Sequence, residues 1–304
     1  MDESQKENFN HLKIHSQYSI CEGAIKTDEL KDYAKENKIK AIALCDSENL
    51  CGALEFSEKL SKVGTQPIIG SQINFKFDDT IGLLPLFALN ENGYKRIIEL
   101  SSLSYLKNDN LSDPHLTFDE LLNKTEGLAL YTGTINGLFG KLFNKGKFNE
   151  IQEIYAKLKS KYGDRFYIEI QRHGDQNENA FEKFNLSISF NLEIPLIATN
   201  EVYYLDKNMH EAHDALICIK NKTYISEKNR IKFTDQHYLK NNSEMMKLFS
   251  DLPEALENNY NFPYRCSFRP VSSDPILPNI SSNEGENADE ILKRNSIEGL
   301  KEKF

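Results

Sequence analysis

The sequence predicts an α/β fold in which a parallel sheet curls into a closed or nearly closed barrel. Short apolar segments, each followed by an amphipathic helical pattern, recur about seven times, and this alternation is typical of parallel strands joined by helical crossovers. No obvious split in composition divides these units among the 304 residues, so we expect them to share one sheet. An open, doubly wound sheet is the alternative arrangement.

Seven segments have the composition of strands. The uninterrupted apolar run AIALC at residues 41–45 is typical of a strand that is covered on both faces. The other six segments are residues 9–15, 66–70, 82–89, 127–131, 165–171 and 194–199. Helical spacing is found over residues 28–37, 94–106 and 148–162, and Thr117 with Glu120 has the spacing of a capping box.

The pattern changes near Ser226. A helix is expected at residues 243–249, and the proline- and serine-rich segment 270–278 is typical of a linker. Residues 287–304 again have helical spacing, with no stop signal at the end. We therefore expect a barrel domain over residues 1–270 and, over residues 271–304, a linker that leads into further structure of a longer chain.

The charge balance bears on possible partners. The 37 basic and 46 acidic residues give a net charge of −9, so the chain as a whole should repel a phosphate backbone. No apolar run reaches the roughly 18 residues of a membrane span, and the first residues lack the apolar centre of a secretion signal. We expect a cytoplasmic protein without membrane contact that meets DNA only through other parts of its assembly.

Polar side chains gather at the expected carboxyl ends of the strands, where parallel barrels place their chemistry. They are His11, Lys13, His15, Asp46, Ser47, Gln72, Thr134, His173, Glu201 and Tyr203. Alternate residues of a strand share a face, so His11, Lys13 and His15 are expected to point the same way. A histidine, an aspartate and a glutamate from three strands could meet at one metal ion. A hydrogen-bonded polar rim fits the composition equally well.

Several segments resemble a known family. HLKIHSQYS at residues 11–19, LCDSENLCGALEF at 44–56, PIIGSQ at 67–72 and IPLIATNEVYYL at 194–205 are similar to the PHP (polymerase and histidinol-phosphatase) domains at the N-terminus of bacterial replicative DNA polymerase III alpha subunits. IQRHG at 170–174, EAHD at 211–214 and LPEALEN at 252–258 follow in the family order. The resemblance begins near residue 9 and implies a distorted seven-stranded barrel, followed by the entry to the polymerase palm.

The resemblance also shows where this chain departs from its family. Members that keep the site hold up to three divalent metals and hydrolyse phosphoesters. Here the ligand positions match Lys13, His15, Asp46, Ser47, Gln72, Leu83, Thr134, Glu201 and Tyr203.

Only His15, Asp46 and Glu201 remain as candidate ligands in this set. A lysine presents three donors and no lone pair at neutral pH, so Lys13 would repel a cation from a ligand position. We interpret the site as vestigial, with Lys13 replacing the charge of the metal against Asp46 or Glu201. The competing interpretation is one surviving metal held by His15, Asp46 and Glu201.

The function implied by the resemblance is that of a scaffold. Such a PHP domain has lost hydrolysis, stabilises the rest of the polymerase chain and docks the separate proofreading exonuclease subunit. We expect no catalytic residue and no cofactor within this chain, because the palm of the full-length polymerase, with its Mg²⁺, lies outside it. The alternatives are a metal-dependent phosphoesterase, pyrophosphatase or 3′–5′ exonuclease, and a free-standing histidinol-phosphatase-like enzyme.

Overall fold

The computed structural model of the chain describes residues 8–108, 112–276 and 287–303. The chain divides into two compact units, Met1–Val271 and Ser272–Phe304. The polar N-terminal residues 1–7 and residues 277–286 of the expected linker lie outside the described part.

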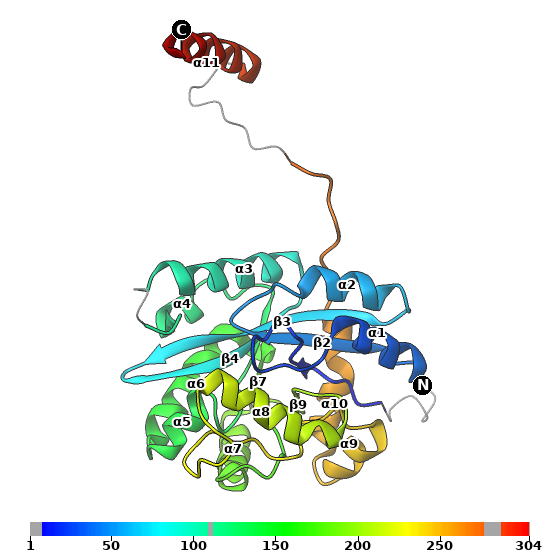
Figure 1. Cartoon of the computed structure of the whole chain (residues 1–304). Coiled ribbons are helices and arrows are strands. Elements are labelled where there is room, and N and C mark those ends of the chain that lie inside the picture. Colours follow the sequence, from blue (N-terminus) through cyan, green and yellow to red (C-terminus); the bar gives the residue numbers. More distant parts are fainter. Residues whose placement is uncertain (1–7, 109–111, 277–286, 304) are drawn as a thin grey trace. The chain divides into compact units, whose positions relative to one another are not determined.

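The first unit is built around one curled, mixed sheet (Figure 1). In chain order its strands are β1 (Lys13–Ile14), β2 (Ala41–Ser47), β3 (Gln66–Phe77), β4 (Thr80–Ala88), β5 (Leu116–Thr117), β6 (Leu128–Tyr131), β7 (Phe166–Ile170), β8 (Leu196–Ala198) and β9 (Glu201–Val202). Their spatial order is β8-β7-β6-β4-β3-β2-β1-β9, with β5 paired to β3. The strands at the two ends of this order, β8 and β9, are separated in the chain only by Thr199 and Asn200. The mixed sheet curls into a half-barrel, which confirms the predicted α/β fold class.

Strand β4 departs from the predicted parallel sheet, because it pairs antiparallel with both β3 and β6. Only Asp78 and Asp79 connect β3 to β4, and Asp78 adopts a left-handed conformation with φ 51°. A connection this short permits a hairpin but no helical crossover. The expectation of an all-parallel sheet is thus wrong at this strand.

The first strand is shorter than predicted. Of residues 9–15, only Lys13 and Ile14 form β1. The backbone N–H of Phe9 donates to Asn242 Oδ1 at 2.6 Å, and that of Asn10 donates to Asn259 Oδ1 at 2.8 Å. Side chains from the C-terminal helices thus satisfy backbone groups that a longer strand would have paired.

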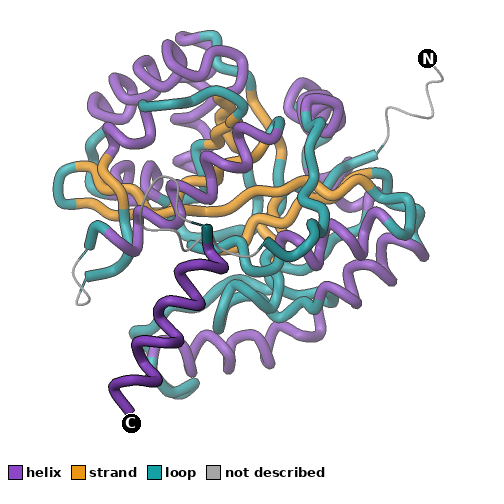
Figure 2. The backbone as a smooth tube through the Cα atoms, turned by 90° about the horizontal axis from the view of Figure 1, so that it is seen from above, coloured by secondary structure: helices purple, strands orange, loops and turns teal. Residues whose placement is uncertain are grey.

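The helices of the first unit lie around the outside of its sheet (Figure 2). They are α1 (Thr27–Glu36), α2 (Ala53–Ser61), α3 (Glu91–Leu106), α4 (Phe118–Leu122), α5 (Leu138–Asn144), α6 (Phe148–Tyr162), α7 (Glu178–Leu192), α8 (His210–Asn221), α9 (Asn242–Leu248) and α10 (Pro253–Asn261), with α11 (Ala288–Lys303) in the second unit. The capping box predicted for α4 is present. No helix in the described residues is long and apolar enough to span a membrane.

Alternation along the strands separates the inside of the barrel from the helical layer. On β2, Ala43 and Cys45 join an inner cluster, whereas Ile42 and Leu44 pack with α1 and α2 residues. On β7, Tyr167 joins the inner cluster, whereas Ile168 belongs to the outer core. Since side chains alternate between faces, Glu169 shares the inner face with Tyr167.

Candidate functional site

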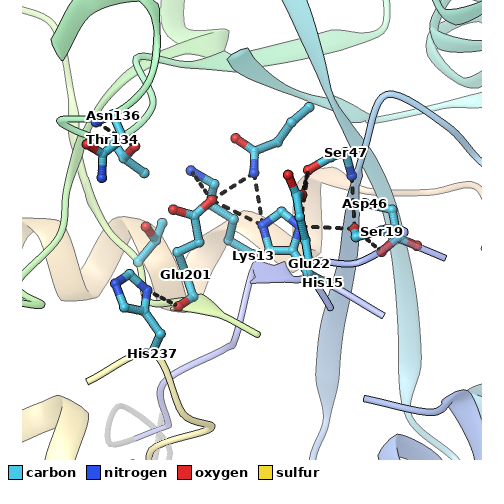
Figure 3. Close-up of polar contacts among 12 residues, drawn as sticks. Lys13, His15, Ser19, Glu22, Asp46, Ser47, Thr134, Asn136, Glu201 and His237 are labelled. Carbon is cyan, nitrogen blue, oxygen red and sulfur yellow. Dashed lines mark hydrogen bonds and ion pairs between the residues drawn. The ribbon is translucent and has the colours of Figure 1, made fainter. Parts of the chain in front are cut away.

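The buried ammonium of Lys13 lies close to two carboxylates at the centre of the site, and Figure 3 shows its contact with one of them, Glu201. Lys13 Nζ is 3.3 Å from Glu201 Oε1 and 3.6 Å from Glu169 Oε2. The side chains of Lys13 and Glu169 have no exposed area, and that of Glu201 is 7% exposed. These separations are longer than those of most direct hydrogen bonds, so the attraction is mainly between the charges.

Burial alone would neutralise these groups. It works to lower the pKa of Lys13, but the charges of Glu169 and Glu201 outweigh it and leave the pKa raised above its usual value. Burial likewise acts to raise the pKa of Glu201, but Lys13 and then His15 hold it well below the usual range. Lys13 and Glu201 are therefore a true ion pair at neutral pH.

His15 is held by neutral partners on its other edge. Its Nδ1 is 3.1 Å from Ser19 Oγ, whose hydroxyl donates to Asp46. The hydroxyl therefore accepts from Nδ1–H, while Nε2 lies 3.1 Å from Glu201 Oε1 and 2.9 Å from the Gln72 amide nitrogen. The Gln72 amide also donates to Glu201 Oε1 at 2.8 Å.

Tyr203 covers this imidazole. Its ring stacks on that of His15 with 4.4 Å between centroids and 21° between planes. Burial, followed by the charge of Glu201, raises the pKa of the Tyr203 phenol well above its usual value. Tyr203 is thus a neutral lid on His15.

Asp46 organises the loop after β1. Its Oδ1 accepts from the backbone N–H of Ser16 and from the Ser19 hydroxyl, both at 2.7 Å, and its Oδ2 accepts from the Ser16 hydroxyl at 2.8 Å. Burial raises the pKa of Asp46 although these donors act against the shift. Of the two carboxylates expected to face Lys13, Asp46 or Glu201, the ion pairs of the described residues include Glu201 but not Asp46, and Glu169 is a second carboxylate that was not expected.

The residues described so far form one group around Lys13, here called the Lys13 cluster: Lys13, His15, Asp46, Gln72, Glu169 and Glu201. A second ammonium, that of Lys220, reaches its edge. Lys220 of α8 pairs with Glu22, which in turn accepts from the Ser47 hydroxyl at 2.6 Å. Ser47 Oγ also lies 3.5 Å from His15 Nδ1. Burial acts to raise the pKa of Glu22, but His15 and Lys220 outweigh it and lower it.

Two predicted members lie elsewhere. His11 Nε2 is 2.8 Å from the carbonyl of Lys240, and burial lowers its pKa to about 4, so His11 is a neutral core residue. The hydroxyl of Thr134 accepts from the backbone N–H of Asn136 at 3.1 Å, apart from the Lys13 network (Figure 3). His11 therefore does not join Lys13 and His15 as the alternation along residues 9–15 predicts, because regular pairing covers only Lys13 and Ile14.

The sequence analysis missed Glu169, although the sequence contains a signal for it. Glu169 interrupts the apolar segment FYIEI, and a charge inside a buried strand requires a partner. Glu22 and Lys220 lie in a loop and at a helix end, 198 residues apart, so no local pattern joins them.

The family resemblance implies divalent metals in this cleft, and the donors present do not fit such a centre. An ammonium occupies the position between Glu169 and Glu201, Ser47 and Gln72 are neutral, and both oxygens of Asp46 are taken by serine donors. Among the residues with described positions, three ligand atoms within 4.8 Å of one another occur at His173, Asp175 and His237, not at His15, Asp46 and Glu201.

Comparison with known proteins places the chain in a family. Residues 11–173 match the PHP domain family model. The chain is 38% identical to the DNA polymerase III subunit alpha of Caulobacter vibrioides over 99% of its own length and 27% of that protein, and 38% identical to that of Rickettsia conorii over 96% and 25%. It thus spans about a quarter of these relatives.

Among solved structures, an amidohydrolase from Chromobacterium violaceum aligns with 12% identity and a TM-score of 0.41, over 64% of this chain and 87% of that one. The family assignment is based on two sequence comparisons: the match of residues 11–173 to the family model and the near-complete alignment to the alpha subunits. The chain belongs to the PHP domain family and is homologous to the N-terminal region of DNA polymerase III alpha subunits.

Proposed function

We propose that this PHP domain is a non-hydrolytic scaffold of a replicative DNA polymerase alpha subunit. The observation that carries the proposal is the ammonium of Lys13, buried 3.3 Å from Glu201 and 3.6 Å from Glu169. A metal-dependent phosphoesterase binds its cation where carboxylates and imidazoles converge and uses the metal's charge to polarise phosphate oxygens or to activate water. In this chain a fixed positive charge stands among the carboxylates instead.

The ammonium has a structural consequence that favours a scaffold. Removal of a metal from a cleft rich in carboxylates would leave buried negative charges without compensation, at a cost of several kcal/mol per ion. Lys13 compensates Glu169 and Glu201, and Lys220 compensates Glu22. The barrel can therefore fold without a divalent ion at this place.

The remaining parts of the proposal follow from the relatives. In the full-length chain, DNA synthesis would take place in a palm that lies outside these residues and uses Mg²⁺. DNA would be gripped by those other parts, since this chain carries a net charge of −9. The domain would work in the cytoplasm, away from membranes, and would dock the proofreading exonuclease subunit on the barrel exterior.

Binding of the cognate exonuclease subunit tests the scaffold proposal. We expect saturable binding in a chemical-shift titration of the folded chain, and the same binding by Gln72→Ala, which alters the interior cluster but leaves the exterior intact. The titration with Asp46→Asn provides a second interior variant. If the folded, monodisperse chain shows no binding at saturating exonuclease, the scaffold proposal is wrong.

A further inference from the structure

A second polar cluster lies beyond Glu201, on the side away from His15. His173 follows β7, Asp175 precedes α7, and His237 belongs to the segment between α8 and α9. His237 Nδ1 is 3.1 Å from the backbone carbonyl of Glu201 (Figure 3). The scaffold function makes no use of this cluster.

The hydrogen bond to Glu201 fixes the state of the His237 ring. A carbonyl oxygen can only accept, so Nδ1 carries the proton and donates it. Nε2 is then the free position, buried and without a hydrogen-bond partner among the described residues. It faces Asp175 Oδ2 at 3.6 Å.

A metal cation fits the gap between His237 Nε2 and Asp175 Oδ2 better than a proton does. A charge-assisted hydrogen bond between an imidazolium and a carboxylate would be about 2.8 Å long, well below the observed 3.6 Å. Two ligand atoms bound to a tetrahedral zinc at about 2.1 Å lie roughly 3.4 Å apart. The donation of Nδ1–H to a carbonyl is also the support that metal-binding histidines usually have.

His173 supplies the third ligand. Its ring stacks on that of His237, with 4.0 Å between centroids and 4° between planes, and it offers a nitrogen within 4.8 Å of the other two ligand atoms. In this parallel stack its lone pair does not point at the gap. Binding therefore requires the His173 ring to tilt. This breaks a 3.3 Å contact from Nδ1 to Glu178 Oε1 and two contacts of Nε2, one of 3.1 Å to Asn200 Oδ1 and one of 3.2 Å to the backbone nitrogen of Glu201.

An open cavity beside the cluster gives access to a cation. The cavity has a volume of about 500 Å³ and is lined by Arg172, Gly174, Asp175, Glu178, Asn179 and Glu182. Arg172 is already paired with Glu182 and Asp251. Asp175 therefore places a carboxylate beside the gap, whereas burial raises the pKa of Glu178 to about 7. The buried ammonium of Lys240 lies 3.1 Å from Asn200 Oδ1, which also contacts His173. Water can reach the gap from the cavity to complete a tetrahedral coordination.

We propose that His173, Asp175 and His237 bind one zinc ion, at a site separate from the Lys13 cluster. The ion joins the loop between β7 and α7 to the segment that leads into α9. Its role is structural. Among the described residues, the segment between α8 and α9 contains no helix or strand, and the ion links it to the loop before α7. The proposal does not depend on the scaffold function.

Zinc titration of the chelator-treated full chain, in competition with a chromophoric chelator, tests this site. We expect one zinc per chain and a loss of affinity of more than about 100-fold in Asp175→Asn and His237→Gln, above the range for groups that only support a ligand. Asp175 is partly buried, so Asp175→Asn should keep the fold even if His237→Gln does not, and circular dichroism checks both variants. Cobalt should show the visible absorption of a tetrahedral site in the wild type but not in Asp175→Asn.

Two control variants separate this site from its surroundings. Glu182→Gln removes a carboxylate that lines the same cavity but is paired with Arg172. Asp46→Asn changes a buried carboxylate of the Lys13 cluster. Both should bind zinc like the wild type. The proposal is overturned if the wild type binds no zinc, if binding survives both Asp175→Asn and His237→Gln in folded protein, or if Asp46→Asn abolishes it.

Discussion

Lys13 and Glu201 are direct neighbours across the parallel pair β1 and β9, and their charged groups lie 3.3 Å apart in the barrel interior. The backbone register sets this contact, so it requires no long or flexible reach from either side chain. Glu169 approaches the same ammonium from β7. Three strands thus contribute to one charge cluster.

Replacement of the ammonium should destabilise the barrel. Lys13→Met keeps the unbranched shape and most of the length of the side chain but leaves Glu169 and Glu201 without compensation. We expect a loss of about 3–5 kcal/mol in the free energy of unfolding. Urea denaturation measures this loss. Adding Glu169→Gln and Glu201→Gln to Lys13→Met should recover most of it. A loss below about 0.5 kcal/mol, the scale of exposed pairs, would mean that the pair is unimportant.

The contribution of the pair should depend on pH at both ends of the range. The lowered pKa of Glu201 gives stability that is present above its unfolded value of about 4.3 and is lost as pH falls toward the folded value. The raised pKa of Lys13 gives stability that is present below about 10.4 and is lost as pH rises through the folded value.

The difference in unfolding free energy between wild type and the triple variant Lys13→Met, Glu169→Gln, Glu201→Gln measures this dependence. We expect a plateau between about pH 5 and pH 10, with a decline on the acid side that begins near pH 4.3. A difference that stays constant from pH 7 to pH 3 would show that Glu201 titrates normally in the folded protein.

Asp46 should act through its hydrogen bonds. Asp46→Ala removes the acceptor of three hydrogen bonds from Ser16 and Ser19 and should cost about 3 kcal/mol. Asp46→Asn keeps an oxygen for the backbone N–H of Ser16, and the Ser16 hydroxyl can turn to accept from the amide, so it should cost less. Hydrogen exchange over residues 16–23 should rise mainly in Asp46→Ala. Equal effects of both variants would indicate that the charge, and not the bonding, matters.

The general plan of the fold could be predicted from the sequence, because the alternation of apolar strands and amphipathic helices is local. The direction of β4 could not, since an apolar segment looks the same in either orientation. The continuation of β3 through Ile73, Phe75 and Phe77 does have a period of two, and this pattern could have indicated a hairpin at Asp78 and Asp79.

The candidate site divides in the same way. The structure brings together five residues that lie at predicted strand ends: Lys13, His15, Ser47, Gln72 and Glu201. His237 could not be found by this reasoning because it lies in an irregular segment, where no period fixes its direction. Its contact with Glu201 depends on how the segment between α8 and α9 folds back over the barrel.

Recovery of a metal centre in the cleft should require several changes together. Lys13→His alone supplies one lone pair, whereas Lys13→His, Ser47→His, Gln72→Glu and Tyr203→His supply four donors. In an Asp175→Asn background, which removes the separate zinc site, we expect zinc uptake by the fourfold variant only. Uptake by Lys13→His alone would mean that the rest of the cleft is still competent.

Metal-dependent hydrolysis by the unmodified chain tests the central claim most directly. Phosphomonoesters, pyrophosphate and single-stranded DNA ends should be supplied in turn with zinc, manganese or magnesium, beside Asp46→Asn as the matched variant. Because Lys13 fills the position of a cation between Glu169 and Glu201, we predict no turnover above the background without protein. Metal-dependent turnover that Asp46→Asn abolishes would contradict the account and identify an active phosphoesterase.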